Sequence, residues 1–333
     1  MSHANISIFV PHLGCPHQCS FCDQVSISGA CCQPNETDID EAVKRAVESP
    51  RYDRENTELA FFGGSFTAID RDYMVRLLSA AYRHVKDGKI SGIRISTRPD
   101  CIDRENLNIL NKFGVTAIEL GAQSMCDDVL LANDRGHNAD DVRKACNMIL
   151  EFGFELGLQM MTGLYKSTFE KDVLTAEEII KCNPHTVRIY PTITLKNTKL
   201  EVLYLSGDYQ PPSLDSTVEL CVKLLKMFEK NEINVIRTGL HSIDTDSYVA
   251  GPWHPAFKEL CDSRVYLEKI IALLPEKGEY KIYVSPKEVS KVVGNKKVNL
   301  NTLSGLGYKC TVVADDGINL SDIRVERMNN SCF

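Results

Sequence analysis

The chain has 333 residues, 43% of them hydrophobic, and a formal net charge of −7 at pH 7. This length and composition predict a folded protein with a sizeable core, exclude a disordered chain, and are not typical of a general nucleic-acid binder. No apolar run reaches the ~20 residues of a membrane span and no signal peptide opens the chain, so we expect a cytoplasmic protein without membrane contact.

Cysteine usage and charge distribution add two further expectations. Thirteen cysteines, an odd number, favour a reducing compartment in which most of them remain thiols. Residues 264–333 contain 11 Lys and Arg against 8 Asp and Glu, or +3, so residues 1–263 carry −10. This asymmetry predicts a small, mildly basic module attached to an acidic main body.

The first predicted element is a strand over residues 6–10, and a cysteine loop follows it. This loop contains Cys15, Cys19 and Cys22 at C-x-x-x-C-x-x-C spacing. Three thiolates are one fewer than a closed zinc site or a four-cysteine iron–sulfur cluster uses, so on a cubane they leave one iron open to another ligand. The alternative is a zinc site whose remaining ligand comes from His12, His17, Cys31 or Cys32.

Beyond the loop, a helix is predicted over 37–47, and strand and helix patterns then alternate. Strands are predicted near 57–62, 91–97, 115–121, 154–161, 185–190 and 233–239, and helices near 70–86, 103–113, 138–152, 168–182 and 214–231. Repeated strand–helix units need parallel strands that are buried on both faces and joined by right-handed connections. The pattern predicts an α/β fold, with a partial TIM-like (β/α)6 barrel over residues 1–262 whose active site lies at the carboxyl ends of the strands.

Residues 263–333 are predicted to form a small α/β domain. A strand near 280–284, a short helix over 286–293, a second helix from 298 and a strand over 309–313 follow one another. The loop Gly294-Asn295-Lys296-Lys297 joins the two helices, as a G-x-x-G loop does in KH-type RNA-binding cores, with Lys297 at the second glycine position. Six lysines against one acidic residue in 281–309 favour polyanion binding, and a non-binding α/β cap is the alternative.

Glycine and polar motifs follow several of the predicted barrel strands. In chain order they are Gly63-Gly64-Ser65-Phe66, Thr97-Arg98-Pro99-Asp100, Gly121-Ala122-Gln123-Ser124, Asp134-Arg135-Gly136-His137 and Ile189-Tyr190-Pro191-Thr192. Together with the cysteine loop, this ordered set resembles the radical S-adenosylmethionine (SAM) superfamily over roughly residues 5–260. Within it, the chain is most similar to the radical SAM half of the Elongator catalytic subunit, and more distantly to oxygen-independent coproporphyrinogen oxidase.

The resemblance implies cofactors and chemistry. Cys15, Cys19 and Cys22 would hold a [4Fe–4S] cluster whose open iron binds SAM, and an electron would cleave SAM to a 5′-deoxyadenosyl radical that abstracts hydrogen from the substrate. It further implies a reductant such as flavodoxin or ferredoxin, and a nucleoside of tRNA or another RNA as the substrate. No acyl-CoA phosphate-binding loop is found after residue 260, so the acetyl-CoA chemistry of Elongator is not carried over.

The resemblance also assigns contacts to SAM. Arg135 matches the position that meets the SAM carboxylate, a task suited to a guanidinium fork. The glycine stretch matches one that binds the methionine amino group, although Ser65 stands where relatives have an acidic residue. The remaining candidates for the methionine, ribose and adenosine are Gly63, Gly64, Thr97, Gln123, Gln159 and Tyr190. For each polar residue the alternative is a hydrogen-bonded group of the barrel mouth.

Two other functions remain open from sequence alone. One is an RNA-binding protein that has lost catalysis and keeps the cluster for structure or redox sensing. The other is radical chemistry on a small molecule, as in coproporphyrinogen oxidation. Reductive cleavage of SAM by the reconstituted protein separates the non-catalytic alternative from the enzymes.

Overall fold

The computed structural model describes residues 4–11, 15, 18–23, 32–240, 243 and 245–328. The chain divides into two compact units. Unit 1 comprises Met1–Ser213 and Leu224–Trp253, and unit 2 comprises Leu214–Lys223 and His254–Phe333. The predicted division into domains of residues 1–262 and 263–333 stays a prediction.

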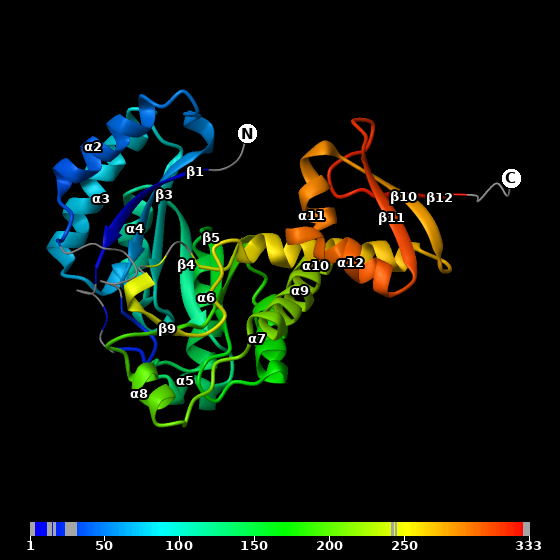
Figure 1. The fold of residues 1–333 in the computed structure, drawn as a ribbon. Helices are drawn as coiled ribbons and strands as arrows, with labels where there is room; N and C mark the ends of the chain where they lie inside the picture. The colour runs from blue at the N-terminus through cyan, green and yellow to red at the C-terminus, as the bar shows by residue number, and fades with distance from the viewer. Residues whose placement is uncertain are drawn as a thin grey trace, which may run out of the picture. The chain divides into compact units, whose positions relative to one another are not determined.

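Unit 1 is built on a seven-stranded sheet in the order β1-β2-β3-β4-β5-β6-β8 (Figure 1). The strands are β1 Ala4–Val10, β2 Thr57–Gly63, β3 Gly92–Thr97, β4 Val115–Gln123, β5 Glu155–Thr162, β6 Thr186–Pro191 and β8 Asn234–Thr238. Every neighbouring pair in this sheet is parallel. Six strand–helix units followed by a last strand confirm the predicted α/β class and the partial TIM-like (β/α)6 barrel.

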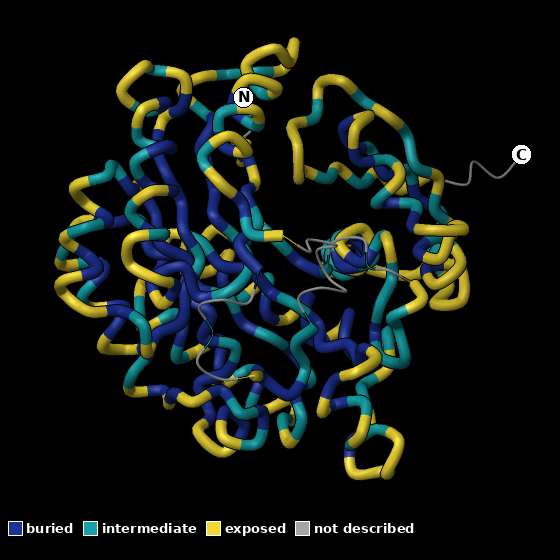
Figure 2. The backbone as a smooth tube through the Cα atoms, turned by 90° about the vertical axis from the view of Figure 1, so that its left-hand side faces the viewer, coloured by how far each residue is buried: buried dark blue, intermediate teal, exposed yellow. Residues whose placement is uncertain are grey.

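Helices connect consecutive strands of the sheet. They are α2 Glu36–Val47, α3 Arg71–Lys86, α4 Arg104–Lys112, α5 Asp127–Ala132, α6 Ala139–Glu151, α7 Phe169–Lys181, α8 Lys199–Leu205 and α9 Leu214–Lys230. A two-stranded antiparallel ribbon, β7 Thr194–Leu195 with β9 Tyr248–Ala250, completes unit 1. Most residues of the central strands are buried and appear as dark blue segments in Figure 2, and the connecting helices cover the outer face of the sheet.

Local capping fixes where two of the helices begin. The side chain of Asn35 accepts hydrogen bonds from the backbone of Thr37 and Asp38, and the Asp38 carboxylate accepts one from the Asn35 backbone at 2.7 Å. Asn138 and Asp141 form the same reciprocal box at α6. Such boxes satisfy amide groups that the first helical turn leaves unpaired, so both helix starts follow from short sequence signals.

The inner face of the barrel carries a buried layer of charge. Arg94 on β3 contacts Glu58 through Nε at 3.0 Å, Glu155 through Nη2 at 3.0 Å and Glu119 through Nη1 at 3.6 Å. Glu119 also accepts a 2.7 Å hydrogen bond from Arg188 Nη2 on β6. Because Glu119 is only 1% exposed, this carboxylate neutralises two buried guanidinium groups at once.

Unit 2 contains a three-stranded sheet in the order β11-β10-β12. Its strands are β10 Gly278–Val284, β11 Tyr308–Ala314 and β12 Arg324–Arg327, and its further helices are α10 Phe257–Leu273, α11 Val289–Val293 and α12 Val298–Gly305. β11 runs parallel to β10 and β12 antiparallel to it. Sequence reasoning anticipated β10, α11, α12 and β11 in this order, but not β12.

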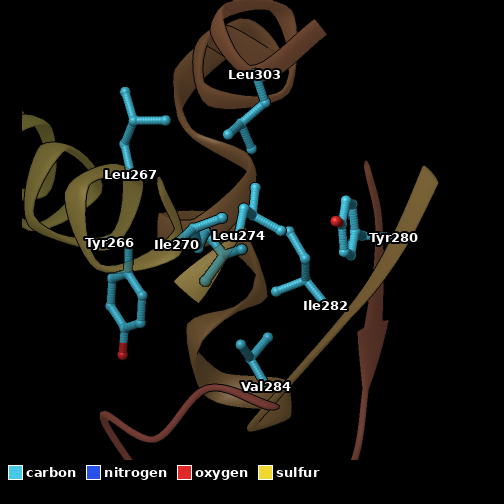
Figure 3. Packing of buried hydrophobic residues seen from close by; sticks show 9 residues of the cluster. Tyr266, Leu267, Ile270, Leu274, Tyr280, Ile282, Val284 and Leu303 are labelled. Carbon is cyan, nitrogen blue, oxygen red and sulfur yellow. The ribbon is translucent and has the colours of Figure 1, made fainter. Parts of the chain in front are cut away.

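The core of unit 2 lies between its sheet and its helices. Ile270 of α10 and Leu274, which directly follows α10, meet Ile282 of β10, and Leu303 of α12 points towards them (Figure 3). All four side chains are at most 5% exposed. No helix among the described residues of either unit is long and apolar enough to cross a membrane.

Removal of the shared carboxylate tests the charged layer of the barrel. We expect Glu119→Ala to lower the free energy of unfolding by about 3–5 kcal/mol, because it leaves buried arginine charge uncompensated. The matched control is Glu151→Ala, which breaks an exposed pair with Arg104 and should cost at most about 1 kcal/mol. Denaturant unfolding measures both values, and equal losses would contradict the buried role of Glu119.

Candidate active site

The described part of the cysteine loop is anchored by backbone contacts. The Cys22 amide donates to the Cys19 carbonyl at 3.1 Å, which makes a tight turn between the two thiols. Ser20 between them donates two hydrogen bonds to Asn133, from its amide to the Asn133 carbonyl at 3.1 Å and from its hydroxyl to Asn133 Oδ1 at 2.8 Å, and its own carbonyl accepts from the Leu200 amide at 2.8 Å. The turn is therefore held by the segments that follow α5 and begin α8.

Burial dominates the electrostatics of the loop. Burial and, to a smaller extent, the charges of Cys19 and Cys15 raise the pKa of Cys22 to about 12, although the nearby Arg135 guanidinium opposes this rise. The metal-free Cys22 thiol is therefore protonated at pH 7. Metal ligation requires the thiolate, so loading of the site must release this proton.

Two of the sequence motifs converge on Cys19. Arg135 donates from Nη1 to the Cys19 sulfur at 3.1 Å, and Arg98 Nη1 lies 3.9 Å from the same sulfur. Arg135 Nη2 also donates to the Gly121 carbonyl, and Arg98 is held by Asp100 with an Nε–Oδ1 distance of 2.9 Å. Positive charge thus surrounds the most buried thiol of the loop.

His137, from the same motif as Arg135, is neutral. Burial and, to a smaller extent, the neighbouring Arg135 and Arg98 charges lower its pKa to about 4. Its Nε2 lies 3.3 Å from the Ala122 carbonyl, to which the neutral ring can donate. The ring therefore adds a hydrogen bond to the site but no charge at pH 7.

The donor set fits an iron–sulfur cluster. Three thiols lie in one loop, and guanidinium N–H groups point at Cys19, as suits the electron-rich sulfur of a cluster. Among the described residues, which include Cys15, Cys19 and Cys22, no group of three or more His, Cys, Asp and Glu side chains is already arranged around a metal position, so the fit rests on the chemistry of the donors. Of the ligands considered for a zinc site, His12, His17 and Cys31 lie outside the described residues, and Cys32 is exposed.

A cavity of about 430 Å³ opens beside the loop, inside the carboxyl-terminal half of the barrel. Phe21 and Cys22 form one part of its wall. The other lining residues are Ser7, Phe9, Phe62, Gly63, Ser96, Gln123, Gln159, Met161, Arg188, Tyr190, Pro191, Ile193, Leu195, Leu240 and Ile243. A mostly apolar cavity with a few polar groups is typical of a small-molecule site, and this volume is in the usual range for one.

The cavity wall includes four of the residues predicted to contact SAM: Gly63, Gln123, Gln159 and Tyr190. Gly63 has φ = +118°, and a Cβ there would lie 2.5 Å from the Val10 carbonyl oxygen, so only glycine fits. Gln123 follows a bulge in β4 with φ = +66°, and its buried Oε1 has no partner among the described residues. Gln159 donates to Glu119 Oε2 at 3.0 Å.

Four other predicted residues, Gly64, Ser65, Thr97 and Arg135, are not part of this wall. The Gly64 amide donates to the Val10 carbonyl at 3.0 Å, and the Ser65 hydroxyl lies 4.0 Å from the Cys15 sulfur. Thr97 is buried, with its hydroxyl 2.6 Å from that of Thr67. Because side chains alternate along a strand, Ser96 faces the cavity in place of Thr97.

Sequence reasoning missed the most conspicuous cation of the cavity. Arg188 lines the wall, its guanidinium lies 5.4 Å from the centre of the Phe62 ring, and its Nε is buried with no partner among the described residues. The available signal was an arginine within the apolar strand run 186–191, where a charged residue is expensive unless it is paired.

Comparison with known proteins now identifies the family. The tRNA uridine(34) acetyltransferase of Dehalococcoides mccartyi is 24% identical over 62% of this chain and 52% of its own length. Human Elongator complex protein 3 is 30% identical over 52% of this chain and 35% of its own length. The chain thus spans about half the length, or less, of these two curated relatives.

The fold has a solved counterpart in the archaeal Methanocaldococcus infernus Elp3 with an N-terminal deletion. It superposes with a TM-score of 0.67 over 81% of this chain and 64% of that one, at 22% identity. The family model of the Radical_SAM C-terminal domain matches residues 184–268, and that of the Radical SAM superfamily matches residues 9–179, just over half of the chain. The chain therefore belongs to the radical SAM superfamily, as an enzyme whose cofactors are a [4Fe–4S] cluster and SAM.

Proposed function

We propose that this enzyme modifies a nucleoside of tRNA or another RNA through hydrogen abstraction. When bound, the cluster and SAM supply reductive cleavage of SAM to a 5′-deoxyadenosyl radical. The main support for this proposal is the cavity, which is lined by Cys22 of the cysteine loop and by the polar side chains of Gln159, Arg188 and Tyr190. The RNA substrate is supported by the relatives named for tRNA uridine(34) acetylation.

In this proposal Cys15, Cys19 and Cys22 hold the cluster, and the cavity beside them holds SAM. The glycine at position 63 lets the ligand approach the backbone, and the free Gln123 Oε1 offers a hydrogen-bond acceptor. Aromatic side chains in the wall exclude water from the reacting groups. Gly64, Ser65 and Thr97 remain proposed SAM residues, although their present contacts place them behind the cavity wall.

Arg135 is proposed to bind the SAM carboxylate. Both of its terminal nitrogens already donate, one to the Cys19 sulfur and one to the Gly121 carbonyl, and its Nε is buried without a partner among the described residues. A two-point contact with a carboxylate would therefore use Nε and one terminal nitrogen. That terminal nitrogen must first break its hydrogen bond to the Cys19 sulfur or to the Gly121 carbonyl. The charge-assisted bonds gained are stronger than the bond given up.

Unit 2 supports RNA binding through the loop between α11 and α12. Lys296 and Lys297 are exposed and both adopt left-handed backbone conformations, with φ = +50° and +62°. Such conformations are unfavourable for side chains with a Cβ, and glycine or asparagine would occupy them at lower cost. We propose that lysine stands here because its charge contacts RNA phosphates, as in a KH-like clamp.

The lysine loop is held in place by a buried asparagine. Asn299, 2% exposed, donates from Nδ2 to the Ser263 carbonyl at 2.9 Å and to the Val292 carbonyl at 3.0 Å. These bonds tie the start of α12 to α10 and α11. The loop is therefore held in one conformation, and binding of a phosphate there would not carry the entropy cost of ordering it.

The partners and the compartment complete the proposal. Reductive cleavage of SAM consumes an electron, so a donor such as flavodoxin or ferredoxin must supply it. We place the reaction in the cytoplasm, because the described cysteines are free thiols and that compartment keeps thiols reduced.

The proposed function is tested by comparing modified nucleosides in RNA from cells with and without the protein. Digested tRNA analysed by mass spectrometry should lack one modified nucleoside, or accumulate its precursor, when the protein is absent. A Cys19→Ala protein supplied in place of the wild type should not restore the nucleoside. Identical profiles in all RNA classes would remove RNA modification as the function.

The cluster ligands give a first biochemical prediction. We expect anaerobic reconstitution to give one [4Fe–4S] cluster per chain, and Ala replacement of Cys15, Cys19 or Cys22 each to abolish it, because two remaining thiolates do not retain a cubane. Cys32→Ala, which alters an exposed thiol, is the control and should keep its iron. Stoichiometric zinc in the anaerobic wild type would refute the assignment.

The proposed carboxylate contact gives a second prediction. Arg135→Ala should keep the cluster but weaken SAM binding by about 1.5–3 kcal/mol, the usual worth of hydrogen bonds to a charged group. This corresponds to a roughly 10- to 150-fold loss of affinity by titration calorimetry. The iron content of the variant serves as the control. If Arg135→Ala bound SAM with the affinity of the wild type, the proposed role of Arg135 would be wrong.

The lysine loop gives a third prediction. Changing Lys296 and Lys297 to Glu should weaken tRNA binding strongly, while SAM cleavage in the absence of RNA stays at the wild-type level. With about three phosphates neutralised, the wild-type log affinity should fall with log salt at a slope near −2. Anisotropy titrations measure both, with Lys144→Glu on the exposed surface of α6 as the control. Unchanged affinity in the double variant would make the loop a solvated lysine face of a structural cap.

A further inference from the structure

Arg237 is the second arginine on the inner face of the barrel near the cavity. It lies on β8 directly opposite Arg188 of β6 in the parallel register, so both side chains project from the same face of the sheet. Arg188 lines the cavity, and Leu240, three residues beyond Arg237, lines it too. Two guanidinium groups are therefore neighbours at one side of the cavity.

The carboxylates of the barrel are already engaged with other partners. Glu119 accepts from Arg188 and Gln159 and lies 3.6 Å from Arg94, which also binds Glu58. Arg237 has a different environment. Its Nε donates to the Gly239 carbonyl at 3.3 Å, and within the described part of the chain no carboxylate oxygen lies within 4.0 Å of it.

Arg188, the neighbour of Arg237, is only partly engaged. Glu119 accepts from its Nη2, but its Nε is buried and makes no hydrogen bond to any described residue. Burial, and to a smaller extent the positive charge of Arg188, lower the pKa of Arg237. The phenol of Tyr190 is close to both arginines, whose charges oppose the rise in its pKa that burial causes. Of these two adjacent cations only Arg188 has a carboxylate partner among the described residues, so they form an incomplete site that an anion would complete.

The position of Arg237 shows how an anion could reach it. β8 is an end strand of the sheet, so its far side is not covered by another strand of the barrel. Arg237 is half-buried, in contrast to the almost fully buried Arg188. A substrate that approaches from this edge would meet Arg237 first and the cavity next.

We propose that Arg237, Arg188 and Tyr190 form an oxyanion subsite of the substrate cavity, in which Arg237 is a positioning residue for the substrate. We assign the oxyanion to a phosphate next to the target nucleoside of RNA. This assignment of the source rests on the proposed function, whereas the subsite itself rests on the arrangement of charges. The carboxylate of SAM carries the same chemistry and is the other source to be tested.

The test uses the full chain, reconstituted with its cluster, as wild type and as Arg237→Gln, Arg237→Lys and Arg104→Gln. Arg237→Gln removes the charge but keeps a hydrogen-bonding side chain, and Arg237→Lys restores the charge. Arg104→Gln is the control, because that arginine pairs with Glu151 on the exposed surface. Three probes are titrated separately, namely inorganic phosphate, SAM and unfractionated tRNA, and the unfolding temperature of each variant is recorded.

We expect Arg237→Gln to weaken phosphate and tRNA binding about tenfold and to reduce the salt slope for tRNA by roughly 0.7, the contribution of one single-strand phosphate contact. SAM affinity should stay within about twofold of the wild type, and Arg237→Lys should recover most of the loss. The unfolding temperature of Arg237→Gln should equal or exceed that of the wild type, because the variant relieves repulsion from Arg188.

Other outcomes separate the subsite from the proposed function. A loss confined to SAM would keep the oxyanion subsite and assign it to the SAM carboxylate. Arg237-dependent phosphate binding by a protein that does not bind tRNA would keep the subsite and reject RNA as substrate. Wild-type affinity of Arg237→Gln for all three probes, or a fall in unfolding temperature without any loss of binding, would overturn the proposal.

Discussion

The parallel alignment of seven strands is the constraint on which the site depends. In a parallel sheet every carboxyl end reaches the same edge, so loops far apart in sequence meet there. The cysteine turn after β1, the glycine end of β2, the arginine after β3 and the motif after α5 come together for this reason. Each motif is short and common on its own, and its chemistry arises from this shared edge.

The charged interior gives this barrel its particular character. A closed TIM barrel fills its centre with branched apolar side chains, whereas here Glu119 joins Arg94 to Arg188 at the same level. Buried ion pairs add little net stability compared with apolar packing of the same volume. Their presence is better explained by the polar groups that they contribute to the cavity wall. They also fix the orientation of Arg188, which is part of this wall.

Two features of the sequence predicted most of the fold and the core of the site. Alternating strand and helix periods gave the barrel, and the spacing of Cys15, Cys19 and Cys22 indicated the cofactor. Contacts between strands of the sheet were harder to predict from the sequence. A choice between Ser96 and Thr97 depends on which side of β3 faces inward, and packing across the sheet sets this facing. The pairing of Glu119 with Arg188 joins residues 69 positions apart, and no local pattern records such a distance.

The same reasoning explains what was missed in unit 2. β12 is a four-residue strand with mainly exposed residues, and β10 is its only partner strand within the described ranges. Its short sequence cannot be distinguished from that of a polar loop. The segment forms a strand because it can pair with the free edge of β10. The two helices α11 and α12 and the loop between them were easier to predict from the sequence, because Gly294 interrupts a clear apolar pattern.

Formation of 5′-deoxyadenosine tests the central claim most directly, since it reports whether the loop and cavity act together as a catalytic site. The protein reconstituted under anaerobic conditions is incubated with SAM and a low-potential reductant, and the products are quantified by mass spectrometry. The account predicts 5′-deoxyadenosine and methionine from the wild type and neither from Cys19→Ala. A wild-type protein that holds its cluster and binds SAM, but yields no 5′-deoxyadenosine with or without added tRNA, would contradict it.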